Sequence, residues 1–207
     1  MARTPDLERR QELLDQIVLY LAQHGLAQAT LRPMAATLDV SINRLVHHFG
    51  TKEELVTAAL ARAIERQVAV QQEWSDRSPR LTTVELYRQW WTWVTASDEN
   101  LALVRLNYEA AALDHSVTGL AGHVRADQIG VWRHYVEQRL VADGVAPERA
   151  ELEGTLVKAA FSGLVMDLLA TGERQRLNTA VEEWLDQLHD RIEAARSLNG
   201  AVGAPLT

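Results

Sequence analysis

The sequence predicts an all-α protein of about nine helices, divided into a small N-terminal domain and a larger C-terminal domain. No segment alternates apolar and polar residues as a half-buried strand does. With 207 residues, the chain is long enough for one or two domains with a buried core. Its prolines lie outside the expected helices or in their first turns, where a missing N–H costs little: Pro5, Pro33, Pro79, Pro147 and Pro205.

Apolar spacing places these helices at 7–24, 31–38, 42–48, 52–74, 82–96, 99–113, 117–142, 147–171 and 178–196. The predicted N-caps are Asp6, Thr82 with Glu85, Ser97 or Asp98, and Asn178. Glycines follow three of the helix ends, at Gly25, Gly144 and Gly172. Residues 197–207 contain two glycines and a proline, so we expect a loose tail there.

Residues 30–55 have the layout of a helix-turn-helix: a short helix, a tight turn, a second short helix and the start of a third. Thr30 is the expected cap of the first helix. Asp39 tolerates the left-handed conformation that the turn requires, and Ser41 caps the second helix. Thr51 and Glu54 have the spacing of a capping box.

The second short helix has two faces. Leu45 and Phe49 are four residues apart and point inward, which leaves Ile42, Asn43, Val46 and His47 pointing outward. On spacing alone, an ordinary pair of short helices in an α-helical core is an alternative interpretation.

At these residues the chain resembles the tetracycline-repressor (TetR) family of one-component transcription regulators, over roughly residues 7–60. In that family the run is Gly-Val-Ser, three variable residues, Leu-Tyr-x-His-Phe, a small residue and Lys-Glu-Glu-Leu. Residues 39–55 here read Asp-Val-Ser-Ile-Asn-Arg-Leu-Val-His-His-Phe-Gly-Thr-Lys-Glu-Glu-Leu. Two positions depart from the family: Asp39 replaces a favoured Gly, and Val46 replaces a Tyr that often touches DNA. Beyond residue 75 the resemblance is one of layout only.

The resemblance implies a domain division and a DNA-binding face. Residues 1–51 would form the DNA-binding domain, 52–74 a connecting helix, 75–200 the effector-binding and dimerisation domain, and 201–207 a flexible tail. By geometry and by match to the family, Ile42, Asn43, Val46 and Arg32 would meet base edges. Other side chains would meet phosphates and fix the register: Thr30, Ser41, Arg44, His47, His48 and Lys52.

Charge is distributed unevenly along the chain, in a direction that fits this division. The net charge is −7, yet residues 1–52 hold six basic and five acidic side chains, whereas the remainder holds 15 basic and 23 acidic. The N-terminal end is thus relatively basic, as a surface that meets phosphate requires.

Six tryptophans are a high count for this length, and three lie together at Trp90, Trp91 and Trp93. Trp90 and Trp93 share one helical face. Core packing is one interpretation, since aromatic side chains dominate cores by area. The other is the wall of an apolar ligand cavity, which the resemblance favours because the family's matching helices surround an effector pocket. Further lining candidates are Asn107, Tyr108, Trp132, Tyr135, Phe161 and Met166.

Two stripes at three-and-four spacing suit helix partners. One comprises Val181, Leu185, Leu188, Ile192 and Ala195; the other comprises Leu152, Leu156, Ala159 and Gly163, with Ala160 beside it. Intrachain packing is the alternative interpretation. The family resemblance favours a homodimer built as a four-helix bundle, and a twofold pair of recognition helices would read two half-sites.

Nothing in the sequence favours an enzyme, a cofactor or a metal site. There is no Cys, no His-Glu-x-x-His, no phosphate loop and no nucleophile elbow, and the spacing of His115, His123 and His134 demands no ion. No targeting segment or apolar run of membrane-spanning length stands out, so we expect a cytoplasmic protein without a membrane partner.

The sequence thus predicts a dimeric, ligand-responsive transcription regulator, and a repressor in preference to an activator. It would bind a palindromic double-stranded DNA operator and be released by a small apolar or aromatic effector. A DNA-binding architectural or adaptor protein without an effector is the alternative.

Overall fold

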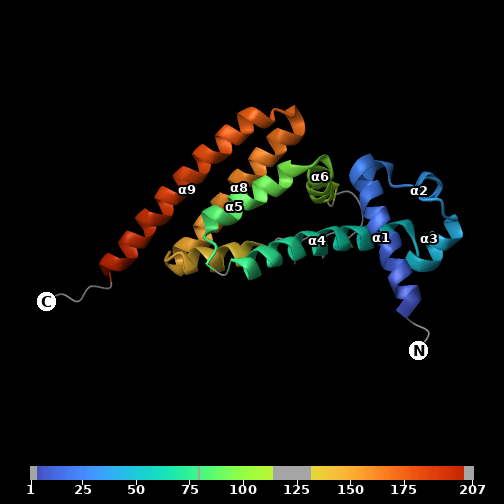
Figure 1. Cartoon of the computed structure of the whole chain (residues 1–207), viewed down its shortest axis with the longest axis horizontal. Coiled ribbons are helices and arrows are strands. Elements are labelled where there is room, and N and C mark those ends of the chain that lie inside the picture. Colours follow the sequence, from blue (N-terminus) through green and yellow to red (C-terminus); the bar gives the residue numbers. More distant parts are fainter. Residues whose placement is uncertain (1–3, 79, 114–131, 203–207) are drawn as a thin grey trace. The chain divides into compact units, whose positions relative to one another are not determined.

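The computed structural model describes residues 4–78, 80–113 and 132–202, and within them it contains helices and connections but no strand (Figure 1). The helices are α1 (Thr4–His24), the 3-10 helix η1 (Leu26–Gln28), α2 (Leu31–Thr37), α3 (Ile42–Phe49), α4 (Lys52–Arg77), α5 (Thr83–Ala96), α6 (Asp98–Leu113), α8 (Pro147–Thr171) and α9 (Arg174–Val202). Residues 132–142 are also helical. The N-terminal part of the helix expected over 117–142 lies outside the described residues, as do His115 and His123.

Contacts divide the described chain into two compact units. Unit 1 contains α1, η1, α2, α3, α4 and α6, and unit 2 contains α5, the helical residues 132–142, α8 and α9. In unit 1, α6 packs on α1 and α4. The sequence had instead led us to expect everything after residue 75 in the C-terminal domain.

Local capping in unit 1 follows the sequence closely. The backbone N–H of Arg44 donates to Ser41 Oγ at 3.1 Å, and Asp39 has a φ of 52° in the turn between α2 and α3. Thr51 and Glu54 exchange two hydrogen bonds, at 2.7 and 3.2 Å, at the start of α4. Thr30 is the N-cap residue of α2, as predicted, but its side chain accepts no hydrogen bond from that helix.

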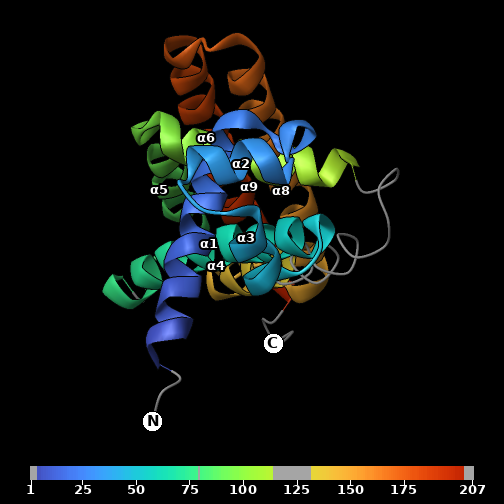
Figure 2. The same cartoon turned by 90° about the vertical axis from the view of Figure 1, so that its right-hand side faces the viewer.

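The core of unit 1 forms around α1. Ile17, Leu21, Met34, Leu45 and Leu55 are all fully buried and come from α1, α2, α3 and α4. Figure 2 shows α1, α2 and α3 lying together around this core. Burial of these side chains fixes α3 by its inner face, so the orientation of that short helix depends on packing and not on helix propensity.

In unit 2, α9 packs against both α5 and α8. The Thr82–Glu85 capping box forms before α5, and the left-handed Gly172 ends α8. Asn178 was predicted as a cap, but α9 already begins at Arg174, and Asn178 Oδ1 accepts from Trp91 Nε1 at 2.8 Å. The tail predicted over 197–207 is also wrong in part, because α9 continues to Val202.

A fully buried carboxylate connects α8 to α9. Glu153 on α8 has no exposed surface; its Oε1 accepts from Arg149 Nη2 at 2.5 Å and its Oε2 from Arg191 Nε at 3.3 Å. Two guanidinium partners offset the cost of burying this charge.

One of the described helices, α8, is long and apolar enough to cross a membrane by length and composition, with a mean hydropathy of 1.3 over 18 residues. This corrects the expectation that no run of that kind exists. It is weak evidence for a membrane span, because core helices of soluble proteins pass the same test. Only 28% of the 18-residue stretch is buried within the chain, so α8 keeps apolar surface that could meet a partner.

Candidate DNA interface and ligand site

The outer face of α3 is free within the described residues. Leu45 and Phe49 are buried as predicted, whereas Ile42 and Val46 are 37% and 45% exposed, and Asn43 and His47 are exposed with them. Apolar side chains with this much exposure beside a polar amide form a surface able to contact base edges.

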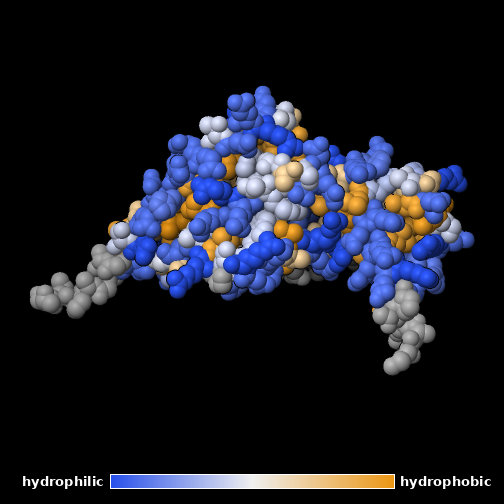
Figure 3. Space-filling model, in the orientation of Figure 1, coloured by the Kyte–Doolittle hydropathy of each residue, from blue (hydrophilic) through white to orange (hydrophobic). Residues whose placement is uncertain are grey.

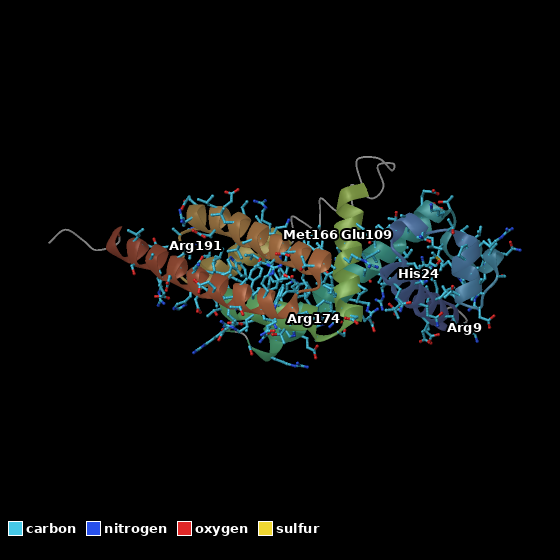
Figure 4. The ribbon with its side chains drawn as sticks, turned by 90° about the horizontal axis from the view of Figure 1, so that it is seen from above. Arg9, His24, Glu109, Met166, Arg174 and Arg191 are labelled. Atoms are coloured by element: carbon cyan, nitrogen blue, oxygen red, sulfur yellow. The ribbon has the colours of Figure 1, made fainter. Side chains whose placement is uncertain are left out.

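The cationic and hydroxyl side chains predicted to accompany this face are also exposed. Arg32, Arg44 and Lys52 are exposed, as are the Thr30 and Ser41 side chains predicted to meet phosphate. Arg9 on α1 is another exposed cation of unit 1 (Figure 4). These groups suit phosphate oxygens, which carry most of the affinity but no sequence information.

His48 has a structural contact that the sequence did not reveal. Its side chain is only partly exposed, and its carbonyl accepts from Arg10 Nε at 3.2 Å. The Arg10 guanidinium also lies 4.9 Å from the centre of the Phe49 ring, a cation–π contact. Arg10 thus joins α1 to the end of α3, and the backbone of His48 is part of that junction.

Two charged residues of α6 hold the junction between α1 and η1. Arg105 Nη2 donates to the Ala22 carbonyl at 2.5 Å, and Glu109 Oε2 accepts from the backbone N–H of Leu26 at 2.8 Å. Arg105 and Glu109 also pair with each other at 3.3 Å. Glu109 on α6 and His24 at the end of α1 are labelled in Figure 4. Sequence reasoning missed both α6 residues, because they resemble an ordinary exposed i, i+4 pair.

Five of the predicted ligand-lining side chains form an aromatic cluster in unit 2. The ring centres of Trp90 and Trp93 are 5.0 Å apart and stacked, those of Trp90 and Trp132 are 5.9 Å apart, and those of Trp132 and Tyr135 are 5.5 Å apart. Phe161 joins through Tyr87, at 5.1 Å.

Two members of this cluster were missed. Tyr87 is fully buried and contacts the rings of Trp132, Phe161 and Trp184. Its position one turn before Trp90 on the same helical face was the available signal. Trp184 comes from α9, and nothing local in the sequence connects it to α5.

The remaining predicted lining residues lie in other surroundings. Met166 on α8 is 48% exposed and belongs to that helix's outer stripe (Figure 4). Asn107 and Tyr108 belong to unit 1, where Asn107 Nδ2 donates to Gln67 Oε1 at 2.9 Å. An open cavity of about 590 Å³ lies elsewhere in unit 2, with none of the predicted residues in its wall; it is lined by Ser78, Arg80, Leu81, Glu85, Arg88 and Gln89.

The predicted seam of α9 is not an available surface. Val181, Leu185, Leu188 and Ile192 are buried inside a single chain, so the intrachain interpretation is correct for this stripe. The outer side of α9 is mostly hydrophilic on the face shown in Figure 3. Exposed acidic residues occupy it at Glu182, Glu183, Asp186, Asp190 and Glu193.

The predicted stripe of α8, by contrast, is exposed. Leu152 and Leu156 are 49% and 47% exposed, and a Cβ placed on Gly163 would meet no atom within 4 Å. Together with Ala159 and Met166 these positions repeat at alternating four- and three-residue spacing, which is the spacing of a helix-pairing seam. Ala160, beside the stripe, is partly exposed.

Within the described part of the chain, no group of three His, Asp or Glu side chains has the arrangement of a metal site. His134 contacts Gln138 at 2.9 Å instead.

Known proteins resemble this chain in two ways. Residues 13–59 match the family model described as bacterial regulatory proteins, tetR family. Among curated proteins, no sequence matches significantly.

Solved structures resemble nearly the whole chain. A transcriptional regulator from Rhodococcus sp. Rha1 shares 19% identity at a TM-score of 0.75, over 90% of this chain and 97% of its own. A TetR transcriptional regulator from Legionella pneumophila shares 15% sequence identity at a TM-score of 0.74, and the match covers 90% of this chain and 97% of that one. The multidrug binding protein EbrR, solved with imidazole, shares 25% sequence identity at a TM-score of 0.61. This match covers 91% of this chain and 93% of the EbrR chain. A second EbrR structure contains proflavin. Residues 13–59 thus carry the helix-turn-helix segment of the tetR family of bacterial regulatory proteins, and the chain shares its fold with solved transcriptional regulators over nine-tenths of its length.

Proposed function

We propose that this chain is a ligand-responsive transcription regulator, and a repressor, that binds a palindromic operator as a dimer. The observation that carries the proposal is the free outer face of α3, on a helix held rigidly by the burial of Leu45 and Phe49. A helix anchored in this way can enter the major groove without losing its own packing.

The side chains on this face have complementary chemistry for base edges. Asn43 would make the paired contact with adenine, and Ile42 or Val46 would pack on a thymine methyl. Arg32 would make the paired contact with guanine, and Thr30, Ser41, Arg44, His47 and Lys52 would hold phosphates. His48 would contribute mainly through its position at the α1–α3 junction.

The exposed stripe of α8 supports the dimer. Leu152, Leu156 and Met166 would pack against the same residues of a second copy, and Ala159 and Gly163 would allow the two helices to approach closely. Burial of this stripe would remove about half of each large side chain from water. A twofold pair of α3 helices would then read two half-sites about 34 Å or more apart.

The aromatic cluster of unit 2 supports a small-molecule effector. Stacked tryptophan faces accept planar or apolar molecules, and the relative EbrR was solved with two planar aromatic compounds. An effector that binds better to a state with wrongly spaced α3 helices would release the operator. We expect α4, as the connecting helix, to carry this change, and we expect no enzymatic activity and a cytoplasmic location.

Selection of DNA from random oligonucleotides tests this function directly. The purified chain should enrich a palindrome with two half-sites, and the Asn43→Ala variant should enrich a palindrome that has lost its base preference at one position in each half-site. Enrichment of a single, non-repeated site would favour an architectural or adaptor protein instead. A failure to enrich any sequence would contradict the proposed function altogether.

A further inference from the structure

The last turn of α3 has a backbone carbonyl that another helix satisfies. The N–H of Gly50 donates to the carbonyl of Val46 at 2.8 Å and ends the helix, so the carbonyls after Val46 have no donor within α3. The carbonyl of His48 instead accepts from Nε of Arg10, 38 residues earlier in the sequence, at 3.2 Å. An arginine of α1 thus completes the end of α3.

This contact places a positive charge at the end of a short helix. A cation is stabilising there, because the carbonyl ends of the peptide dipoles point toward it. The guanidinium also lies 4.9 Å from the ring centre of Phe49, a residue that is 6% exposed. With eight residues, α3 is too short to be stable by itself. Arg10 is therefore a positioning residue for α3.

These two contacts use only part of the guanidinium. Arginine has five N–H donors, and its Nη atoms can bind a phosphate or a carboxylate through two parallel hydrogen bonds. Within residues 4–78, 80–113 and 132–202, Arg10 makes no other hydrogen bond and no ion pair. Its side chain is partly exposed, and its Nη atoms are not buried. The Nη atoms are thus available to an anion outside the chain.

The Nη atoms lie near one end of α3, where two residues predicted to meet phosphate also lie. His47 on the last turn of α3 and Lys52 at the start of α4 are both exposed. An eight-residue helix is about 12 Å long, and the major groove is about 12 Å wide. When the outer face of α3 enters the groove, the end of so short a helix therefore comes close to a bordering phosphate backbone.

We infer that Arg10 binds a backbone phosphate of duplex DNA through its Nη atoms while its Nε atom continues to hold the carbonyl of His48. One guanidinium then connects α1, α3 and the DNA backbone. The phosphate contact fixes the register of α3 in the groove and carries no sequence information itself. This inference rests on the proposed function, since it adds a contact to the proposed DNA face.

The salt dependence of DNA binding tests the contact. We would measure the affinity of the full-length chain for its selected operator by fluorescence anisotropy at several salt concentrations. Each phosphate that a protein neutralises adds about 0.9 to the slope of log K against log salt. Arg10→Gln should therefore reduce the slope by about 0.9 for each bound subunit. An unchanged slope would overturn the inference.

The matched control removes the same charge from the same unit. Arg77 is exposed at the far end of α4, a helix of 26 residues and thus about 39 Å long, so it lies well away from α3. Arg77→Gln should leave the slope unchanged. If it flattens the slope as much as Arg10→Gln does, the effect comes from net charge and the inferred contact is wrong.

Uncharged phosphate analogues locate the contact on the DNA. Operators that carry one methylphosphonate at a time should reveal a position in each half-site where the unaltered chain loses about tenfold in affinity. Arg10→Gln should lose nothing further at that position. A purely structural role of Arg10 would weaken binding to every substituted operator alike, and that result would overturn the inference.

Citrulline in place of Arg10 gives the same tests if the glutamine variant does not fold. It keeps the shape of the side chain and the Nε–H that holds the carbonyl of His48, but it carries no charge. Urea titration should therefore show the stability of a correctly positioned α3, and the salt slope should still fall. A citrulline variant with the full slope would overturn the inference.

The inference and the proposed function can fail separately. If a palindrome is enriched but Arg10→Gln keeps the full salt slope, the regulator function stands and the Arg10 contact is wrong. If no sequence is enriched, but the chain binds duplex DNA of random sequence with a slope that Arg10→Gln flattens, the contact is correct and the regulator function is wrong.

Discussion

Glu109 on α6 accepts a hydrogen bond from the backbone N–H of Leu26, 83 residues away in the sequence, at a distance of 2.8 Å. Leu26 begins the 3-10 turn that leads from α1 into the helix-turn-helix. A single carboxylate thus connects α6 to the turn that precedes the helix-turn-helix, and Arg105 donates to the Ala22 carbonyl on the α1 side of the same junction.

Removing this carboxylate should weaken both stability and operator binding. Glu109→Ala leaves the partly buried Leu26 N–H without its acceptor, which we expect to lower the free energy of unfolding by about 1–3 kcal/mol. Glu109→Gln keeps an acceptor oxygen and should lose less. Urea titrations of both variants measure this, and an equal loss in the two would show that the hydrogen bond to Leu26 contributes little.

Two substitutions on the DNA face should behave differently. Asn43→Ala should cost about 1–3 kcal/mol for the best operator and relax the preference at one position in each half-site. Lys52→Ala should weaken all sequences similarly and reduce the salt dependence. Binding titrations on the operator and on scrambled DNA at several salt concentrations separate the two effects. Uniform weakening by both variants would mean that Asn43 does not read a base.

A charge in the α8 stripe should separate the subunits. Leu156→Glu places a carboxylate where the proposed dimer would bury it without a partner, yet in one chain the position is half exposed, so the fold should survive. The variant should sediment as a monomer and lose operator affinity. Leu198→Glu on α9, where the leucine is 70% exposed, is the matched control. A dimeric Leu156→Glu variant would place the interface elsewhere.

Substitutions at two neighbouring tryptophans should affect different properties, ligand binding at Trp93 and stability at Trp91. Trp93 is partly exposed and stacked on Trp90, so Trp93→Leu should weaken proflavin binding and leave the operator affinity nearly intact. Trp91 is buried, contacts Phe161 and donates to Asn178, so Trp91→Leu should lower stability by about 3 kcal/mol. Thermal melts and fluorescence titrations check both. Equal losses of stability and of both binding activities would assign Trp93 to the core as well.

The ion pair between α1 and α4 predicts an acid-dependent change in stability. Arg62 donates to both oxygens of Asp15, at 2.8 and 3.0 Å, and these bonds lower the pKa of Asp15 below its ordinary 3.8. A carboxyl with a depressed pKa in the folded state stabilises the fold above its unfolded pKa and loses that contribution as the pH falls through the folded value. The stability difference between the chain and Asp15→Asn should therefore be constant above about pH 5 and shrink below pH 4. A difference independent of pH would show that the pair does not contribute.

The sequence predicted the local features of the fold well. The Ser41 cap, the Thr51–Glu54 box and the left-handed Asp39 were all expected, because each depends on residues within a few positions of one another. The inward face of α3 was expected for the same reason, since Leu45 and Phe49 are one helical turn apart.

Features that depend on distant partners were not predictable. Helical spacing identified apolar stripes on α8 and α9 equally, but it could not show that Leu188 packs inside the chain while Leu156 faces outward. Glu109 and Gln67 resembled ordinary helix residues until their partners Leu26 and Asn107 were known. Five of the predicted ligand-lining aromatic side chains do lie together, but Tyr108 belongs to unit 1, and the contribution of Trp184 from α9 was not expected.

The buried Glu153 has a consequence for the evolution of this chain. Its two guanidinium partners come from α8 and α9, and loss of either would leave a charge with no exposed surface only half compensated. Homologues should therefore carry either both Glu153 and Arg191 or, at both positions, apolar residues of similar volume. Chimaeras that join α9 of one homologue to α8 of another should fold only when both parents carry the charged pair, or both carry an apolar pair, at these two positions.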